Sequence, residues 1–153
     1  MSGGVKNHKK RYLLILSCSK RKKLVSKAPA LELYDGPFYR VLRKNMPPNL
    51  DVLVLSAKYG LINSDKIISH YDQMMTVEKA EELVDEVKTK LENFLKNNNY
   101  NKIFINLSGI YLIALKKSEE LLDKNNVYWA KGQIGERLHQ LKSWLADINK
   151  ERD

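Results

Sequence analysis

Short apolar runs alternate with longer amphipathic stretches along this chain, and the alternation predicts strands and helices in turn. Four runs are almost continuously apolar, at residues 12–18, 51–56, 102–107 and 127–130. A strand that is covered on both faces has this pattern, whereas a half-exposed strand alternates apolar and polar residues. We therefore predict four buried strands.

Helical periodicity separates these strands. After Thr76, a good N-cap, apolar residues recur three and four positions apart to about residue 97. Three further helices are predicted at residues 37–46, 108–123 and 134–149. Strands that alternate with helices are typical of βαβ units. The predicted fold class is α/β, a single three-layer domain that has a mainly parallel sheet of about four strands and helices on both faces.

No internal repeat or linker divides the chain, and 153 residues most simply form one domain. We expect residues 1–10 to be a disordered lead-in and residues 11–150 to form the α/β domain. The first residues lack the apolar core of a signal peptide, and no apolar run reaches the roughly 18 residues that a membrane span needs. One cysteine allows no intramolecular disulfide, so we expect a reducing, cytoplasmic setting and no membrane partner.

Positive charge is concentrated in the first third of the chain. The net charge is +9; residues 1–50 hold 12 Lys and Arg against two acidic residues, whereas residues 51–153 hold 15 against 16. This asymmetry favours a polyanionic partner or a phosphate-bearing ligand. A solvated, lysine-rich surface is the alternative interpretation. The candidate nucleic-acid-binding residues are Lys20, Arg21, Lys22, Lys23 and Lys27.

Small and polar residues follow three of the predicted strands, at residues 17–20, 56–60 and 106–109. If these strands are parallel neighbours, their ends meet at one edge of the sheet, where ligands bind in open α/β folds. Small side chains let backbone N–H groups approach a ligand, and a helix start at Gly109 offers a positive dipole to an anion. Ordinary turns are the alternative. The candidate ligand-binding residues are Ser17, Ser19, Lys20, Tyr34, Ser56, Tyr59, Gly60, Tyr71, Asn106, Ser108, Gly109 and Arg137.

Three residues near these strand ends are candidates for catalysis, namely Cys18, Lys58 and Asp72. Basic neighbours favour a nucleophilic thiolate at Cys18, although a lone cysteine at a strand end is more often a packing residue. We expect Lys58 to stabilise an anion, Tyr59 to stack on a base, and Asp72 to transfer a proton or simply to organise its turn. Arg137 can clamp a phosphate or carboxylate, or form a solvated first helical turn. One cysteine and three scattered histidines give no metal-ligand spacing, so no metal or cofactor is predicted.

Several ordered motifs resemble a known family. They are Ser-Cys-Ser-Lys-Arg-Lys at 17–22, Ala-Pro-Ala at 28–30, Leu-Tyr-Asp-Gly at 33–36, Leu-Ser-Ala-Lys-Tyr-Gly-Leu at 55–61, Tyr-Asp at 71–72 and Gly-Gln-Ile-Gly-Glu-Arg-Leu at 132–138. Over about residues 12–145 the chain resembles an uncharacterised prokaryotic and phage family, a domain of unknown function.

Two looser likenesses carry functional expectations. The YaaA peroxide-stress family has a corresponding strand-end motif, a Tyr-bearing segment after it and a later Asn-Leu-Ser/Ala strand end, and is linked to DNA binding and protection from oxidative damage. The core domain of archaeosine synthase, which acts on a deazaguanine base in tRNA, begins with a similar Cys-Ser-x-x-Lys motif. The likenesses imply a YaaA-like domain with a sheet-edge pocket, lined by Ser17, Cys18, Ser19, Lys58, Tyr59, Tyr71, Asp72, Asn106 and Ser108.

These features predict a protein that binds a nucleotide or modified base. Whether it also acts as an enzyme on a nucleobase or nucleic acid is left open. Its pocket is expected at the carboxyl ends of the strands. The alternative is a non-catalytic DNA- or RNA-binding module, YaaA-like and stress-related, that uses the basic first third and loses affinity steeply with salt. Against that module, no predicted helix is basic along one face, and few aromatic residues are placed to stack on single strands. A structural or partner-binding domain is the third hypothesis, and the oligomeric state is left open.

Overall fold

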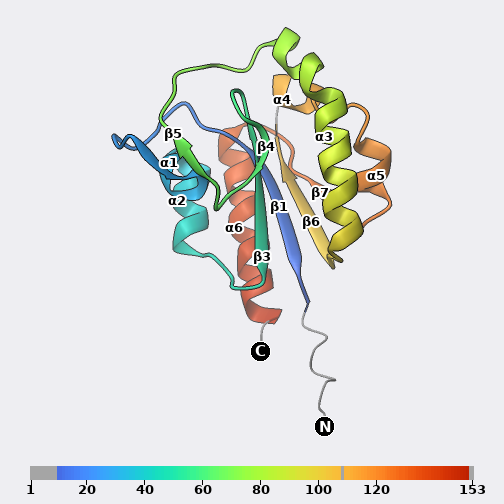
Figure 1. Ribbon diagram of the computed structural model, residues 1–153. Coiled ribbons are helices and arrows are strands. Elements are labelled where there is room, and N and C mark those ends of the chain that lie inside the picture. The colour runs from blue at the N-terminus through green and yellow to red at the C-terminus, as the bar shows by residue number, and fades with distance from the viewer. Residues whose placement is uncertain (1–9, 108, 152–153) are drawn as a thin grey trace.

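The computed structural model describes residues 10–107 and 109–151, and a five-stranded sheet lies at its centre (Figure 1). The strand order is β4-β3-β1-β6-β7. These strands span Gly60–Asn63 (β4), Leu50–Ser56 (β3), Tyr12–Ser17 (β1), Lys102–Asn106 (β6) and Val127–Trp129 (β7). All neighbouring strands are parallel except for the antiparallel pair β3 and β4. The predicted parallel strands are therefore confirmed, and an antiparallel edge strand is added to them.

The central strand β1 shows why the apolar runs are continuous. Tyr12, Leu14 and Leu16 pack into one hydrophobic core, while Leu13 and Ile15 pack into a second core on the other face. None of these five side chains is more than 1% exposed. Because both faces of the strand are covered, every position selects an apolar residue.

Helices cover both faces of the sheet, as the three-layer prediction requires (Figure 1). On one face lie α2 (Pro37–Lys44) and α6 (Ile134–Glu151). On the other face lie α3 (Val77–Asn97), α4 (Ile110–Ile113) and α5 (Glu119–Asp123). The α/β fold class is confirmed. Within the described residues, no helix is both long enough and apolar enough to cross a membrane.

Local signals set the helix starts. The Oγ1 atom of Thr76 accepts a hydrogen bond of 3.1 Å from the backbone N–H of Lys79, so Thr76 is the predicted N-cap of α3. Pro37 occupies the first turn of α2, where its missing N–H costs no helical hydrogen bond.

The helix predicted over residues 108–123 is instead two short helices. Between α4 and α5, the N–H groups of residues 114–116 bond to carbonyls three residues earlier. Such bonds belong to a tighter turn than the α-helix, and they bury Ala114 and Leu115 beneath α3. The prediction of one continuous helix was wrong because tertiary packing overrides the local periodicity here.

A second, small sheet lies beside the main one and was not predicted. It pairs β2 (Lys27–Pro29) with β5 (Ile67–Ser69) in antiparallel fashion, and the short helix α1 (Ala30–Leu33) follows β2. Three-residue strands are too short to show an apolar period. The edge strand β4 was missed for a similar reason, since it follows β3 after a tight turn that ends at Gly60, whose φ is +75°.

Candidate functional site

The ends of β1, β3 and β6 converge at one edge of the sheet. Ser17 is paired with Leu55, and Leu16 is paired with Asn106. The N–H of Cys18 then donates a 3.0 Å hydrogen bond to the carbonyl of Leu55. Residues that are far apart in the sequence therefore share this carboxyl edge, which is where open α/β sheets bind their ligands.

A hollow of about 300 Å³ opens at this edge. Its wall is made from the end of β1, the segment that precedes α3, and the start of α4. The lining residues are Cys18, Ser19, Lys20, Lys22, Asp72, Gln73, Met74, Met75, Gly109, Ile110 and Tyr111. Thioether, isoleucine and phenol groups give it an apolar wall, and two ammonium groups and one carboxylate give it a polar rim.

Cys18 lies half-buried in this hollow, with its Sγ atom 3.2 Å from the Oη atom of Tyr111. Burial, with a smaller contribution from the neighbouring thiol, raises the pKa of Tyr111 well above its ordinary value of 10. The phenol therefore stays protonated near neutral pH and is available to donate to the sulfur.

The ammonium groups of two lysines lie near the aromatic ring of Tyr71, beside the hollow. The Nζ atom of Lys22 lies 4.4 Å from the centre of that ring, and the Nζ atom of Lys58 lies 5.8 Å from it and 5.3 Å from the ring of Tyr59. These are cation–π distances, which hold an ammonium group without neutralising it. Lys22 lines the hollow, whereas Lys58 is exposed outside it.

Behind these lysines, three hydroxyl groups form a closed ring. The Oη atoms of Tyr34 and Tyr71 are 2.7 Å apart, Ser56 Oγ lies 3.0 Å from Tyr71, and Tyr34 donates to Ser56 at 3.4 Å. Ser56 Oγ also accepts from the N–H groups of Lys58 and Tyr59. Burial raises the pKa of Tyr34 to about 12, and burial raises that of Tyr71 further. The ring is therefore neutral, and its members satisfy one another.

Tyr59 packs against the aromatic ring of Tyr71. Its ring meets that of Tyr71 edge to face, with centres 5.5 Å apart, and its hydroxyl donates to the carbonyl of Ser69. Gly60 begins β4. Ser17 sits at the end of β1, where its carbonyl accepts a 2.7 Å hydrogen bond from Tyr39.

Arg137 and Asn106 form a buried pair on the face of the sheet that α2 and α6 cover. The Nη1 atom of Arg137 donates to Asn106 Oδ1 at 2.8 Å, and its Nε atom donates to the carbonyl of Gly132 at 3.2 Å. Arg137 is 8% exposed and Asn106 is 1% exposed. The first turn of α6 and the end of β6 position these two side chains.

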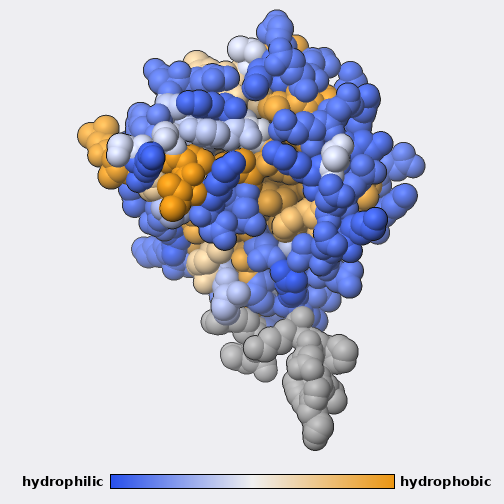
Figure 2. All heavy atoms as spheres, viewed as in Figure 1, coloured by the Kyte–Doolittle hydropathy of each residue, from blue (hydrophilic) through white to orange (hydrophobic). Residues whose placement is uncertain are grey.

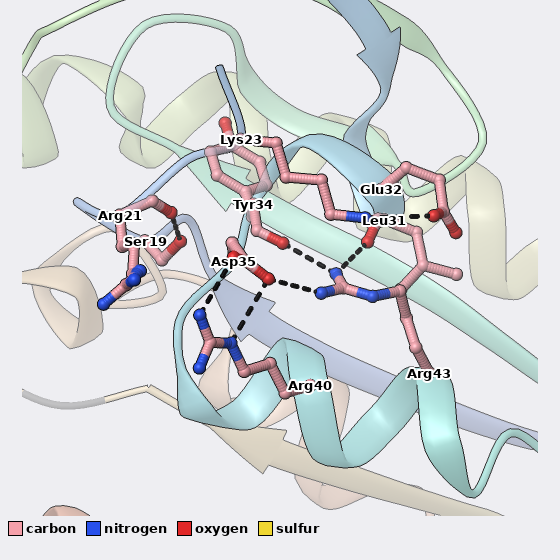
Figure 3. A network of polar contacts seen from close by, with 9 residues as sticks. All are labelled: Ser19, Arg21, Lys23, Leu31, Glu32, Tyr34, Asp35, Arg40 and Arg43. Carbon is pink, nitrogen blue, oxygen red and sulfur yellow. Dashed lines mark hydrogen bonds and ion pairs between the residues drawn. The ribbon is translucent and has the colours of Figure 1, made fainter. Parts of the chain in front are cut away.

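The basic loop, residues 20–27, leaves the hollow and is fixed at its base (Figure 3). Asp35 accepts hydrogen bonds from Arg40 and Arg43, and its N–H donates to the carbonyl of Arg21. The Arg40 contact is the largest cause that lowers the pKa of Asp35, which falls to about 2. Lys23 lies 3.7 Å from Glu32. Asp35 lies in the turn between α1 and α2, and its partners come from the loop and from α2.

The structure thus gathers some of the sequence-predicted residues and separates others. Those that line the hollow are Cys18, Ser19, Lys20, Asp72 and Gly109. Those outside its lining are Ser17, Tyr34, Ser56, Lys58, Tyr59, Gly60, Tyr71, Asn106 and Arg137. Of the predicted nucleic-acid-binding residues, Lys20 and Lys22 line it, and Arg21, Lys23 and Lys27 continue along the basic loop. Ser108 lies outside the described residues.

The sequence did not reveal Gln73 or the apolar wall of the hollow, which comprises Met74, Met75, Ile110 and Tyr111. Met74 is 70% exposed and Ile110 is 38% exposed, although both are apolar. The one available signal is the Met-Met pair one residue after Tyr71-Asp72, in a segment with neither helical nor strand periodicity.

A second hollow of about 370 Å³ lies between β4 and the end of α3. It is lined by Leu53, Leu61, Asn63, Lys90, Asn93, Phe94, Asn97 and Asn98. It is larger, but it holds neither a thiol nor a carboxylate and none of the strand-end residues. Across residues 10–107 and 109–151, no group of three potential metal ligands is present.

Together the fold and this edge define an α/β protein with a candidate ligand site where its parallel strands end. The chain belongs to DUF6884, a family of unknown function whose model matches residues 13–143. The crystal structure of AF0587, a protein of unknown function, is similar in fold, with a TM-score of 0.54 and 15% identity over 89% of this chain. This chain spans 44% of AF0587, and at that identity the likeness concerns the fold alone. No curated protein matches the chain.

Proposed function

We propose that the hollow at the carboxyl edge binds a nucleobase, carried by a nucleotide, a free modified base or a nucleic acid. Its volume of about 300 Å³ suits one heterocycle and its substituents. Met74, Met75 and Ile110 offer apolar surface to the faces of a flat ring. The sequence likeness to the core domain of archaeosine synthase, which acts on a deazaguanine, supports a base as the ligand.

One observation carries this proposal, namely that a single hollow gathers a carboxylate, a thiol and two ammonium groups around apolar surface. Asp72 is a hydrogen-bond acceptor for the ring N–H or amino group of a base. Lys20 and Lys22 supply positive charge for a phosphate or for a developing anion on the ring.

In an enzyme, these groups take distinct roles. Cys18 is the proposed nucleophile because it carries the chain's one thiol and opens into the hollow beside the phenol of Tyr111. Asp72 is the proposed acid–base residue. Lys58, which lies over the ring of Tyr71 outside the hollow, is the proposed anion-stabilising residue. Lys22, which lines the hollow, shares that role.

Calorimetric titration with nucleosides, nucleotides and deazapurines tests the proposal. The variant Ile110→Trp fills the hollow and should lower affinity at least about tenfold, while Leu112→Trp leaves it open. The two are matched controls, because each residue is 38% exposed on α4 and Ile110 alone lines the hollow. If no base binds, or if both variants bind equally well, the proposal is wrong.

A second candidate function is a nucleic-acid interface on the basic loop. Backbone hydrogen bonds hold the loop on either side of its tip. The N–H of Lys23 donates to the carbonyl of Leu33, and the N–H of His70 donates to the carbonyl of Ser26. Between them the tip projects from the body, and Figure 2 shows orange atoms at its end. Leu24 is 96% exposed there. Phosphate-binding cations around an apolar wedge are a feature of proteins that insert side chains between base steps.

This second function predicts an affinity for DNA or RNA that falls steeply with salt. A variant with Lys20, Arg21, Lys22 and Lys23 replaced by Gln should lose binding uniformly across sequences. The matched control replaces four exposed lysines elsewhere, Lys96, Lys124, Lys142 and Lys150, and should keep it. Affinity that is indifferent both to salt and to the loop substitutions would exclude this function.

A further inference from the structure

Arg137 is a nearly buried cation that has no counter-ion in the part of the chain that the structure describes. Its guanidinium contacts two neutral acceptors, the carbonyl of Gly132 and the side-chain oxygen of Asn106. Among residues 10–107 and 109–151, no carboxylate oxygen lies within 4.0 Å of it. Burial lowers the pKa of Arg137 below its ordinary value of 12.5, as expected of a charge removed from water without a partner.

The acid next to it in sequence is engaged elsewhere. Glu136 folds back and accepts a 2.9 Å hydrogen bond from the N–H of Gln133, which caps the start of α6. The guanidinium of Arg137 lies instead 5.1 Å from the centre of the Phe38 ring. An aromatic face stabilises a cation but does not neutralise it.

Asn106 carries the second unsatisfied group. Its Oδ1 atom accepts from Arg137, while its Nδ2 atom is buried and has no hydrogen-bond partner among the described residues. A buried donor that is left unpaired costs about 1–3 kcal/mol. A buried charge that has no counter-ion and a buried donor that has no acceptor among the described residues therefore meet in one place.

This place adjoins the carboxyl edge of the sheet. Asn106 ends β6 and lies three residues before Gly109, which lines the hollow. Phe38 follows Gly36, and a Cβ atom on Gly36 would lie 3.0 Å from the Cβ atom of Ser19, another lining residue. The pair and the hollow are thus connected through both β6 and the start of α2.

We propose that Arg137 and Asn106 form a binding subsite for an oxyanion, a phosphate or a carboxylate. A guanidinium presents a planar fork that matches such an anion, and the first turn of α6 adds a favourable dipole. The anion would accept hydrogen bonds from the guanidinium of Arg137 and from the Nδ2 amide of Asn106. The charge would then gain a counter-ion, and the amide would gain an acceptor. The subsite stands on its own geometry; the further assignment, that it receives the phosphate of a nucleotide in the hollow, rests on the proposed function.

A titration with inorganic phosphate, and separately with acetate, tests the subsite by itself and distinguishes the two sources of the anion. Thermal unfolding and calorimetry would be recorded for the native chain and three variants. Arg137→Met removes the charge, and binding should weaken at least about tenfold. Lys142→Met removes one exposed charge from the same helix, and binding should be unchanged.

Asn106→Asp is the most decisive variant. It places a carboxylate beside Arg137, so the protein would supply the counter-ion that the bound anion otherwise provides. Its unfolding temperature without ligand should rise, and added phosphate should no longer raise it. If Arg137→Met does not fold, this variant carries the test. The subsite is refuted if neither anion binds the native chain, or if Asn106→Asp and Arg137→Met respond to the anion as the native chain does.

Failure of the subsite and failure of the base site give different results. A nucleoside without phosphate reports on the hollow alone, so Ile110→Trp should weaken it and Arg137→Met should not. Lys20 and Lys22 also attract phosphate, so only the part of inorganic phosphate binding that Arg137→Met abolishes reports on the subsite, and Ile110→Trp should leave that part unchanged. A nucleoside monophosphate should lose affinity in both variants; loss in only one of them would separate the two sites.

Discussion

Two buried polar clusters lie at the same edge of the sheet and differ in how well their groups are satisfied. In the hydroxyl ring, Tyr34, Ser56 and Tyr71 donate to and accept from one another, and Ser56 accepts two further N–H groups. In the second cluster, Arg137 has no carboxylate among the described residues, and an Asn106 donor has no acceptor.

The difference indicates which of the two clusters stabilises the fold and which can bind a ligand. A satisfied network in a low-dielectric interior stabilises the fold and fixes its geometry, whereas an unpaired charge costs free energy. The hydroxyl ring therefore supports the wall of the edge, holding the segment around Tyr71 against β3. The Arg137–Asn106 pair is the cluster with capacity left for a ligand.

The largest effect is expected when the ring is opened at its centre. Ser56→Ala removes the acceptor for Lys58 N–H and Tyr59 N–H and breaks both tyrosine contacts. We expect a loss of about 2–4 kcal/mol in the free energy of unfolding, measured by urea titration. The exposed Ser143→Ala on α6 is the control and should change it by less than about 0.5 kcal/mol. Equal effects of the two substitutions would contradict the structural role.

A smaller loss is expected when one phenol leaves the ring. Tyr34→Phe should cost about 1–2 kcal/mol, because the hydroxyls of Ser56 and Tyr71 keep one contact. If the ring is cooperative, the loss in the double variant Tyr34→Phe, Tyr71→Phe will differ from the sum of the single losses. Strict additivity in urea titrations would show that the three hydroxyls act independently.

The hydroxyl ring also predicts that the stability of the fold decreases at alkaline pH. The pKa of Tyr34 is about 12 in the folded chain and ordinarily 10, so the folded state holds its proton more tightly. This contribution is complete below pH 10 and is lost as the pH rises from 10 to 12. Stability measured across that window should fall more steeply in the native chain than in Tyr34→Phe. Parallel curves would contradict the pKa shift.

The smallest effect on stability is expected at the other cluster. Arg137→Met removes a buried charge that has no counter-ion among the described residues, and this gain offsets the loss of the donor to Asn106 Oδ1. The free energy of unfolding should therefore change by less than about 1 kcal/mol or rise. Urea titration beside Ser56→Ala compares the two clusters directly. A loss as large as that of Ser56→Ala would mean that Arg137 is held for stability, and the contrast between the clusters would fail.

The sequence was sufficient for the parts of the fold that depend on local pattern. Continuous apolar runs predicted the parallel strands, and Thr76 predicted the start of α3. The antiparallel strand β4 and the break between α4 and α5 depend on tertiary contacts, since Leu61 and Leu115 are buried by the same core beneath α3. No periodicity in these short segments reveals that packing.

The candidate site divides in the same way. Residues that follow strands, such as Cys18 and Gly109, could be predicted to lie together because parallel strands end at one edge. Tyr111 could not be predicted as a neighbour of Cys18, because it lies in the short helix α4 and the direction of its side chain depends on how that helix packs. The Gly-Glu-Arg motif pointed to Arg137 as an anion clamp, but only the structure shows that Glu136 is engaged in capping and that Asn106 is half-satisfied.

The carboxyl edge, with its hollow and the Arg137–Asn106 pair, is the proposed ligand site. Amide NMR spectra during titration with a nucleoside monophosphate test it most directly. We expect shifts at residues 19–22 and 109–111 around the hollow, and at the Nε–H group of Arg137. Unchanged spectra would exclude a ligand site at this edge, as would shifts confined to the larger hollow between β4 and α3, around Asn63 and Lys90.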